Sequence, residues 1–153
     1  MRLVIQRVSR ASVEIDEKEV RKINKGFVVL LGICKSDTEE DMNYLINKLI
    51  KLRIFEENDK MNLSLDDVDG EILLISQFTL YANTKNGNRP SFEESMNYKD
   101  ANILYDKFVK NLKEKYNKIK TGGFGSHMKV SLINDGPVTI IIDSKENNIW
   151  KVR

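Results

Sequence analysis

The chain has 153 residues, which is long enough for one domain with a buried core and no stabilising metal or disulfide. Hydrophobic residues make up 41% and charged residues 31% of the chain, a globular composition that excludes a disordered protein. Lys and Arg number 25 against 23 Asp and Glu, and this near balance excludes a broadly basic protein that coats nucleic acid. Any contact with RNA must therefore be local.

Cysteine content and hydropathy indicate the compartment. Cys34 is the only cysteine, so no intrachain disulfide is possible, and no cluster of Cys and His has metal-site spacing. The N-terminus lacks the apolar core of a signal peptide, and no stretch approaches the ~20 apolar residues of a membrane span. We therefore expect a cytoplasmic protein that needs no metal, cofactor or membrane.

The N-terminal part of the chain predicts an opening β-hairpin and a central strand. Residues 2–8 alternate between apolar and polar and then run apolar, and residues 11–15 alternate. A polar turn follows at 16–18. Residues 27–34 form a continuous apolar run, which is typical of a strand covered on both faces. This strand should lie inside a sheet.

A helix should follow over residues 37–51. Ser36 and Glu39 have the spacing of a capping box, and apolar residues then recur at helical intervals. Beyond the helix, the pattern predicts a short strand at 52–55 and a polar loop at 56–69.

The next part repeats this scheme, with a buried strand at 71–80, a turn-rich loop at 83–90 and a second helix. Apolar residues between Ala101 and Tyr116 mark one face of that helix. Its other side carries a row of lysines, which we interpret as a solvated face rather than an RNA track. These are Lys107, Lys110, Lys113 and Lys118.

The C-terminal part predicts a flexible loop at 122–125, an alternating strand at 127–133, a tight turn at 134–137 and a last strand at 138–143. With about seven strands and two helices, we expect a single α/β domain in which the helices cover one face of mixed, twisted β-sheets, giving β/β/α layers. The domain should span residues 1–145, with a polar tail at 146–153.

The predicted strand at 71–80 begins apolar and ends in polar residues beside a loop, a place where functional sites occur. A hydroxyl nucleophile at Ser76 or Thr79 would need a neighbouring base, and His127 is the only histidine. No G-x-S-x-G motif supports a catalytic triad. A lone histidine at a strand start is more often a structural or surface residue.

The segment from Asn134 to Pro137 has two interpretations. Asn, Asp, Gly and Pro are the usual turn formers, so a plain hairpin turn explains the segment on local grounds. Pro137, however, stands at the mouth of an apolar strand, where it withholds a backbone donor. X-Pro bonds are cis in only ~5% of folded cases, so a cis bond here would serve a purpose.

From Met1 to Asp143 the chain resembles the D-aminoacyl-tRNA deacylases, also called D-tyrosyl-tRNA deacylases. The resemblance rests on five motifs in the same order as in that family. They are Ile5-Gln6-Arg7-Val8, Ser76-Gln77-Phe78-Thr79-Leu80, Arg89-Pro90-Ser91-Phe92, Phe124-Gly125 and Asn134-Asp135-Gly136-Pro137-Val138-Thr139.

The resemblance implies a homodimer with active sites at the subunit interface, acting on the 3′ end of D-aminoacyl-tRNA. Gly136 and Pro137, joined by a cis peptide, would enter the active site of the other subunit. Their backbone carbonyls would bind the substrate α-amino group and leave no room for an L side chain, so chirality is enforced by rejection. Arg7 would brace this segment, and Phe124 and Gly125 would lie near the terminal adenosine.

Ser76, Gln77, Phe78 and Thr79 would surround the scissile ester, with the Phe78 amide as an oxyanion donor. The chemistry could use Thr79 as nucleophile or the tRNA ribose 2′-hydroxyl without a side-chain base. The absence of an evident base near the hydroxyls favours the second mechanism, because positioning and oxyanion stabilisation are large terms on their own.

Two other functions fit the residues alone: an RNA-binding module without catalysis, and a hydrolase of small D-amino-acid esters. The near-neutral charge argues against the first. Glycyl-tRNA is a further possible substrate. Ser126 departs from the family pattern, which more often has alanine after Phe-Gly, and Trp150 in the tail matches no family motif.

Overall fold

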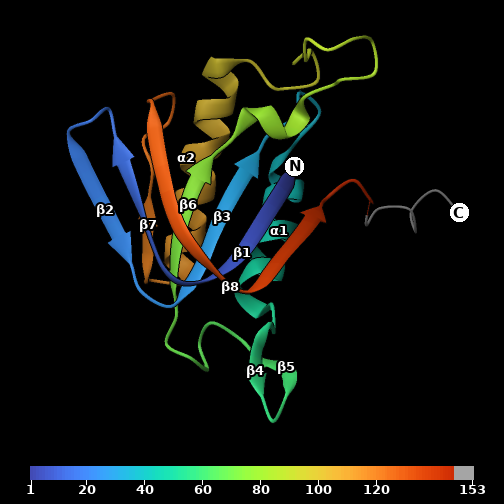
Figure 1. The fold of residues 1–153 in the computed structure, drawn as a ribbon. Coiled ribbons are helices and arrows are strands. Elements are labelled where there is room, and N and C mark those ends of the chain that lie inside the picture. Colours follow the sequence, from blue (N-terminus) through green and yellow to red (C-terminus); the bar gives the residue numbers. More distant parts are fainter. Residues whose placement is uncertain (147–153) are drawn as a thin grey trace, which may run out of the picture.

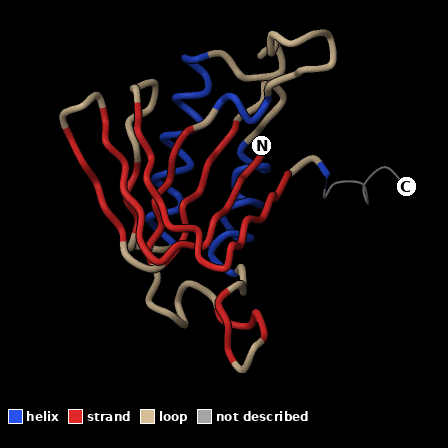
Figure 2. The backbone as a smooth tube through the Cα atoms, viewed as in Figure 1, coloured by secondary structure: helices blue, strands red, loops and turns tan. Residues whose placement is uncertain are grey.

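The computed structural model describes residues 1–146, which form eight strands, two α-helices and one 3₁₀ helix. Figure 1 labels these elements, and Figure 2 separates helices, strands and loops by colour. In chain order they are β1 (Arg2–Ile15), β2 (Glu19–Ile23), β3 (Gly26–Gly32), α1 (Glu39–Lys51), β4 (Phe55–Glu57), β5 (Lys60–Leu63), β6 (Glu71–Ser76), η1 (Phe78–Tyr81), α2 (Tyr98–Lys115), β7 (Ile119–Thr121) and β8 (Met128–Asp143).

The main sheet has the order β2-β1-β3-β6-β7, with β8 paired to β1. β3 pairs with β6 and β6 with β7 in parallel, and a parallel pair needs a crossover connection. α1 lies in the crossover from β3 to β6, and α2 lies in the crossover from β6 to β7. Both crossovers step in the same direction across the sheet. Because such connections have the same handedness, both helices lie on one face of the sheet. Figure 1 shows both helices behind the sheet, as predicted, and β3 holds the predicted central position.

The strand β1 takes part in two layers. Its first half, residues 2–8, pairs with β3, and its second half, residues 11–15, pairs with β2. The second half of β1 therefore lies with β2 and the start of β8 over the sheet face that the helices leave open. Val28 and Leu73 pack there, whereas Val29 belongs to the core beneath the helices. The predicted β/β/α layering is confirmed.

Both predicted helices are present, but the cap of α1 differs from the prediction. The Thr38 N–H donates to the Asp41 carboxylate at 2.9 Å, so the capping box is Thr38 with Asp41 rather than Ser36 with Glu39. Three acidic residues in the first turn suit the positive end of the helix dipole. The Asn97 side chain caps α2 by accepting from the Asp100 N–H at 3.0 Å.

The prediction of two strands joined by a tight turn at 134–137 is wrong. Residues 128–143 form one strand, β8, which pairs with β1 from Ile15 to Arg2. The register shifts between Gln6 and Val8, where the single residue Arg7 faces residues 135–138. The extra residues of β8 form a bulge. The strand stays continuous across the bulge because the residues on both sides of it pair with β1.

Other differences concern short or irregular elements. β1 is continuous, and its hairpin partner is β2, which the sequence did not predict. β4 begins where the strand at 52–55 was predicted to end, and β5 lies in the predicted loop. β7 was also missed. Strands of three to five residues are too short to show a period, which explains these errors.

The predicted tail at 146–153, including Trp150, lies outside the described residues apart from Glu146. Among the described residues, neither helix has the length and apolar character needed to cross a bilayer.

Candidate active site

The strand β6 ends at Ser76, four residues earlier than predicted, and the chain turns into the 3₁₀ helix η1. Gln77 makes the change of direction with φ −146° and ψ 84°, and its N–H donates to the Leu31 carbonyl at 2.8 Å. Phe78 and Thr79 open the helix, and the first N–H groups of a helix have no acceptor within it. The N–H groups of Phe78 and Thr79 therefore have no acceptor within η1.

A cavity of about 580 Å³ lies beside this turn. It is bordered by the ends of β3 and β6, the start of α2 and the loop that leads into β8. Its lining is mainly apolar, with a small number of polar groups, which is the usual character of a small-molecule site. The lining residues are Leu31, Ile33, Ile75, Ser76, Gln77, Phe78, Met96, Tyr98, Ala101, Phe124, Gly125, Ser126, His127, Met128 and Val130.

Aromatic rings stand at the rim of the pocket. The Phe124 ring lies between Tyr98 and Tyr105 of α2, with centroid distances of 5.2 and 5.1 Å. The Phe78 side chain is 58% exposed and meets the Phe92 ring edge-on at 5.0 Å. Exposed rings that are held by other rings provide surfaces on which a planar base or an apolar side chain can stack.

Gly125 allows the loop to approach α2 closely. Its φ is +73°, and a Cβ at this position would lie 2.7 Å from the Tyr98 ring, so only glycine fits. Within residues 1–146, the buried hydroxyl of the neighbouring Tyr105 has no hydrogen-bond partner, and burial raises the pKa of Tyr105 to about 12. Tyr105 therefore stays neutral at physiological pH and supports Phe124 by packing.

The hydroxyl of Thr79 is not set up as a nucleophile. It is exposed and accepts a hydrogen bond from the side-chain amide of Gln77. A nucleophilic hydroxyl needs a base within hydrogen-bond reach. The partner found here is an amide, which cannot take a proton from it.

The bulge of β8 has its own set of contacts at the other end of the sheet. The Asn134 side chain spans it, accepting from the Val138 N–H and donating to the Thr139 hydroxyl, both at 3.0 Å. The Gly136–Pro137 peptide bond is cis, as the resemblance implies, and both residues are exposed. Residues 135–138 thus leave the ladder between β1 and β8, and the Asn134 side chain spans the gap.

Arg7 anchors the bulge from below and is only 6% exposed. Its Nε donates to the Asp135 carbonyl at 3.0 Å and its Nη1 to the Ile54 carbonyl at 2.8 Å, while Nη2 lies 3.5 Å from Glu56. One guanidinium therefore joins the bulge to the segment between α1 and β4. A Cβ on Gly136 would lie 2.9 Å from Arg7 Nη2.

Comparison with known proteins assigns the chain to a family. Residues 4–143 match the family model described as D-Tyr-tRNA(Tyr) deacylase. The chain belongs to this family. The D-aminoacyl-tRNA deacylase of Clostridium botulinum (strain Langeland) is 54% identical over 147 residues, covering 95% of this chain and 99% of that protein. A protein of the same name from Thermosipho melanesiensis is 52% identical over 148 residues, with the same coverage.

Solved structures similar to this deacylase-family chain include the following two. The structure named c-Myc DNA Unwinding Element Binding Protein has a TM-score of 0.88 and 39% identity, covering 94% of this chain and 98% of its own. A probable eukaryotic D-amino acid tRNA deacylase has a TM-score of 0.82 and 17% identity, covering 93% and 98%, and shows the shared fold alone.

The residues carried over from the deacylase family fall into two groups. Ser76, Gln77, Phe78, Phe124 and Gly125 line the pocket together, although they come from distant parts of the chain. Thr79 is their neighbour in sequence but not among the lining residues.

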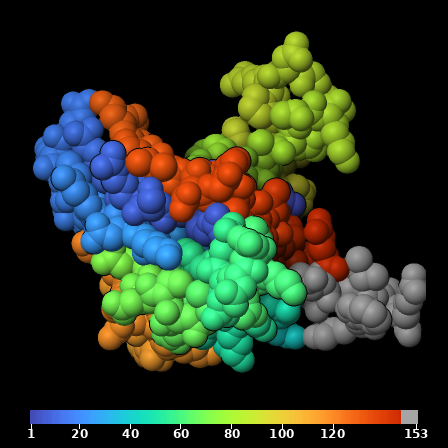
Figure 3. Space-filling view, turned by 60° about the horizontal axis from the view of Figure 1, so that its bottom comes forward, coloured from blue at the N-terminus to red at the C-terminus, as the bar shows by residue number. Residues whose placement is uncertain are grey.

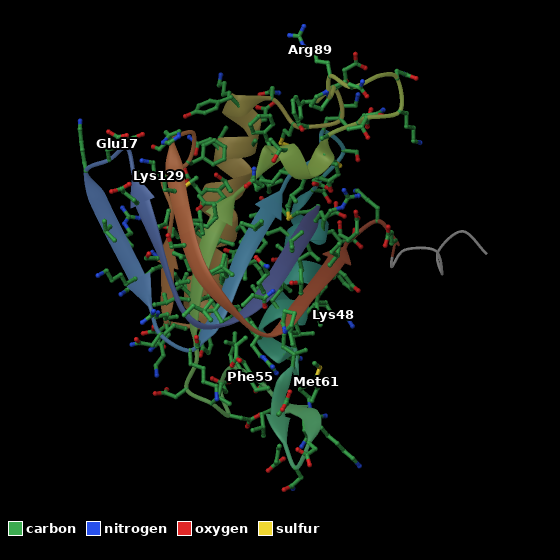
Figure 4. The ribbon with its side chains drawn as sticks, viewed as in Figure 1. Glu17, Lys48, Phe55, Met61, Arg89 and Lys129 are labelled. Atoms are coloured by element: carbon green, nitrogen blue, oxygen red, sulfur yellow. The ribbon has the colours of Figure 1, made fainter. Side chains whose placement is uncertain are left out.

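The second group, Arg7, Gly136 and Pro137, lies at the opposite end of the sheet. Ser76 ends β6 at the edge where the pocket opens, whereas Arg7 contacts Ile54 beside Phe55. Figure 4 places Phe55 at the lower end of the molecule, far from the upper edge where β6 ends. One deacylase-family chain therefore does not bring the two groups together.

Met96, Tyr98 and His127 are among the pocket-lining residues that sequence reasoning did not assign to the site. The second helix was predicted from its apolar face, which begins at Ala101, so its first turn and Tyr98 were not considered. His127 was given little weight as a lone histidine, yet the position two residues after Gly125 was a usable signal. Its backbone N–H donates to Asp16 at 3.0 Å, which ties the pocket loop to the first hairpin.

Proposed function

We propose that this protein hydrolyses the ester bond of D-aminoacyl-tRNA and thereby removes wrongly attached D-amino acids. The observation that carries the proposal is the aromatic pocket lined by Ser76, Gln77 and Phe78 at the start of η1, in a chain of the deacylase family. Such a pocket holds an adenosine or an amino-acid side chain beside donors for a carbonyl oxygen. Charged tRNAs are made and used in the cytoplasm, where we place the activity.

The reaction is hydrolysis. The oxygen of water forms a bond to the carbonyl carbon of the amino acid, and the bond between that carbon and the ribose 3′-oxygen breaks. The Phe78 N–H, assisted by that of Thr79, stabilises the negative charge on the carbonyl oxygen in the tetrahedral intermediate. The ribose 2′-hydroxyl relays the proton from water to the leaving 3′-oxygen. No side-chain base is required, in line with the Thr79 hydroxyl, whose hydrogen-bond partner is the Gln77 amide rather than a base.

The site becomes complete in a homodimer, in which Gly136 and Pro137 of one subunit enter the pocket of its partner. The separation of the two groups within one chain supports this arrangement. The outer edge of β8 also supports it, since β8 pairs only with β1 among the described strands, and Ile133 and Ile141 are 45% and 65% exposed. A long open edge with exposed apolar residues is a common pairing surface.

Chiral selection follows from two carbonyl oxygens at fixed positions. The carbonyls of Gly136 and Pro137 accept hydrogen bonds from the substrate ammonium group, which fixes the α-carbon. The D side chain then points toward the pocket, and an L side chain would collide with the bulge backbone. Because the selection uses backbone atoms, we expect broad acceptance of D-amino acids and also of glycine, which lacks a side chain.

Hydrolysis of D-Tyr-tRNA, L-Tyr-tRNA and the ethyl ester of D-tyrosine tests the activity. We expect cleavage of D-Tyr-tRNA, with L-Tyr-tRNA slower by at least ~10²-fold and the free ester cleaved poorly. No turnover of any substrate would favour a non-catalytic RNA-binding module. Equal kcat/KM for the ester and D-Tyr-tRNA would favour a hydrolase of small esters.

Mixing two inactive variants tests the shared site. Phe78→Pro removes the proposed oxyanion donor from the pocket, and Gly136→Ala distorts the bulge. A mixed dimer has one site in which both elements are intact, so a mixture in equal amounts should recover roughly a quarter of wild-type activity. If the mixture stays inactive after subunit exchange, each site is built within one chain.

A further inference from the structure

The segment 83–91 is a hairpin loop that stands away from the body of the protein, and we call it the projecting loop. The backbone groups of Asn83 and Ser91 bond to each other in both directions, at 2.8 and 2.9 Å. The Asn83 side chain also accepts from the Lys85 N–H at 2.9 Å. Figure 3 shows this loop extending beyond the compact part of the molecule. Its base is therefore fixed, while its tip faces solvent.

The projecting loop differs in charge from the rest of the chain. Positive and negative side chains nearly balance overall, but between Gln77 and Phe92 the only charged residues are the cations Lys85 and Arg89. Within the described part of the chain neither has a salt bridge, whereas Lys35 is 3.4 Å from Glu94 just beyond the loop. Figure 4 shows Arg89 pointing outward from the loop.

The loop is joined to the candidate active site at its base. Phe92, one residue past the loop, packs edge-on against Phe78 at 5.0 Å, and Phe78 lines the pocket. The Ser95 hydroxyl donates to the Phe78 carbonyl at 3.1 Å. The cations of the loop are thus held at a set position relative to the pocket, on the side where η1 begins.

We propose that the projecting loop binds the sugar-phosphate backbone of the tRNA acceptor end, with Lys85 and Arg89 contacting phosphates. This inference rests on the proposed function. Extended chain covers about 3.3 Å per residue, so a four-residue arm reaches roughly 13 Å past the base. Phosphate contacts carry no sequence information, so the loop adds affinity for tRNA without selecting among tRNAs.

The test compares two substrates in the double variant Lys85→Gln/Arg89→Gln. One is D-Tyr-tRNA, and the other is 3′-O-(D-tyrosyl)adenosine, which has the ester and the terminal nucleoside but no phosphate. At 50 mM salt, kcat/KM for D-Tyr-tRNA should fall about tenfold, the scale of two lost exposed ionic contacts. The value for the adenosine ester should stay at the wild-type level.

Lys110→Gln/Lys113→Gln serves as the matched control, because it removes two exposed cations from the outer face of α2. This variant should keep wild-type kcat/KM on both substrates. The salt dependence gives a second measure, since each phosphate contact contributes ~0.7 to ~0.9 to the slope of log K against log salt. The loop variant should therefore lose about 1.4 to 1.8 of that slope.

Three results would overturn the proposal: an unchanged kcat/KM for D-Tyr-tRNA in the loop variant, an equal fall for both substrates, or an equal fall in the α2 control. These outcomes differ from a failure of the proposed function. In that case the wild-type protein itself would cleave neither substrate.

Discussion

Two segments carry the backbone atoms proposed for the reaction, the turn at 76–79 and the bulge at 134–139, and they are held in different ways. The turn is fixed from within the sheet, because Gln77 bonds to β3 and the strand before it belongs to the buried core. The bulge is fixed by two side chains, Arg7 and Asn134. The first segment borders a pocket within its own chain, and the second is exposed at the other end of the sheet, where we propose that it serves a partner subunit.

The largest effect is expected where the bulge is most constrained. Gly136 has φ +132°, and a Cβ there would lie within 3 Å of both Val138 and Arg7, so Gly136→Ala must move the carbonyls at 136 and 137. Losing two hydrogen bonds to a charged ammonium group should lower kcat/KM for D-Tyr-tRNA roughly 10³-fold. Because the bulge is exposed, the free energy of unfolding should fall by no more than about 2 kcal/mol.

Steady-state kinetics and thermal unfolding of the same preparation separate these effects. A fall in stability that accounts for the whole loss of activity would make the bulge a structural element. Wild-type kinetics in Gly136→Ala would remove it from the site.

The turn is tested by a pair of variants at Phe78. Both lose the ring, but Phe78→Ala keeps the backbone N–H and Phe78→Pro removes it. Proline is tolerated at the first position of a helix, and Gln77 before it lies outside the helical region that a following proline disfavours, with φ −146° and ψ 84°. Removing one oxyanion donor costs ~10²-fold or more, so kcat of the Pro variant should be about that much below kcat of the Ala variant. Equal kcat values would show that the amide is not the donor.

Arg7 connects the bulge to the interior, and Arg7→Lys tests that connection at constant charge. A single ammonium group cannot reach the carbonyls of both Asp135 and Ile54, which the guanidinium contacts together. We expect a loss of about 1 to 3 kcal/mol in unfolding free energy and a fall of roughly tenfold in kcat/KM.

Glu56→Gln is the control, since this carboxylate is 58% exposed and 3.5 Å from Arg7, and it should change either quantity little. If Arg7→Lys behaves like this control, the bulge holds its shape without the guanidinium.

The fold follows from local sequence where elements are long and periodic. The apolar run of β3 and the apolar faces of α1 and α2 predict their positions correctly. Periodicity fails at β8, because Asn134 to Pro137 are good turn formers and the pairing that keeps the strand continuous lies with β1, more than a hundred residues earlier. Contacts that distant leave no mark on the local pattern.

The site could be predicted only in part for a related reason. Polar residues at the end of an apolar strand drew attention to Ser76 and Gln77, and both line the pocket. Tyr98 lies near them only because α2 returns across the sheet, which no local pattern encodes. The proposed joint role of the pocket and Gly136 rests on family resemblance, because within one chain they lie at opposite ends of the sheet.

The smallest effect is expected from substitution of His127, which lines the pocket. This substitution tests whether the turn and the bulge suffice for the reaction without a side-chain base. Histidine is the side chain whose charge changes near neutral pH, and general-base catalysis contributes 10²- to 10⁴-fold. If the 2′-hydroxyl and the backbone donors carry the reaction, His127→Ala should keep kcat/KM within about threefold of wild type. Loss of a general base would lower kcat/KM much further. A drop of a hundredfold or more would make His127 the base and reduce the backbone donors to a supporting role.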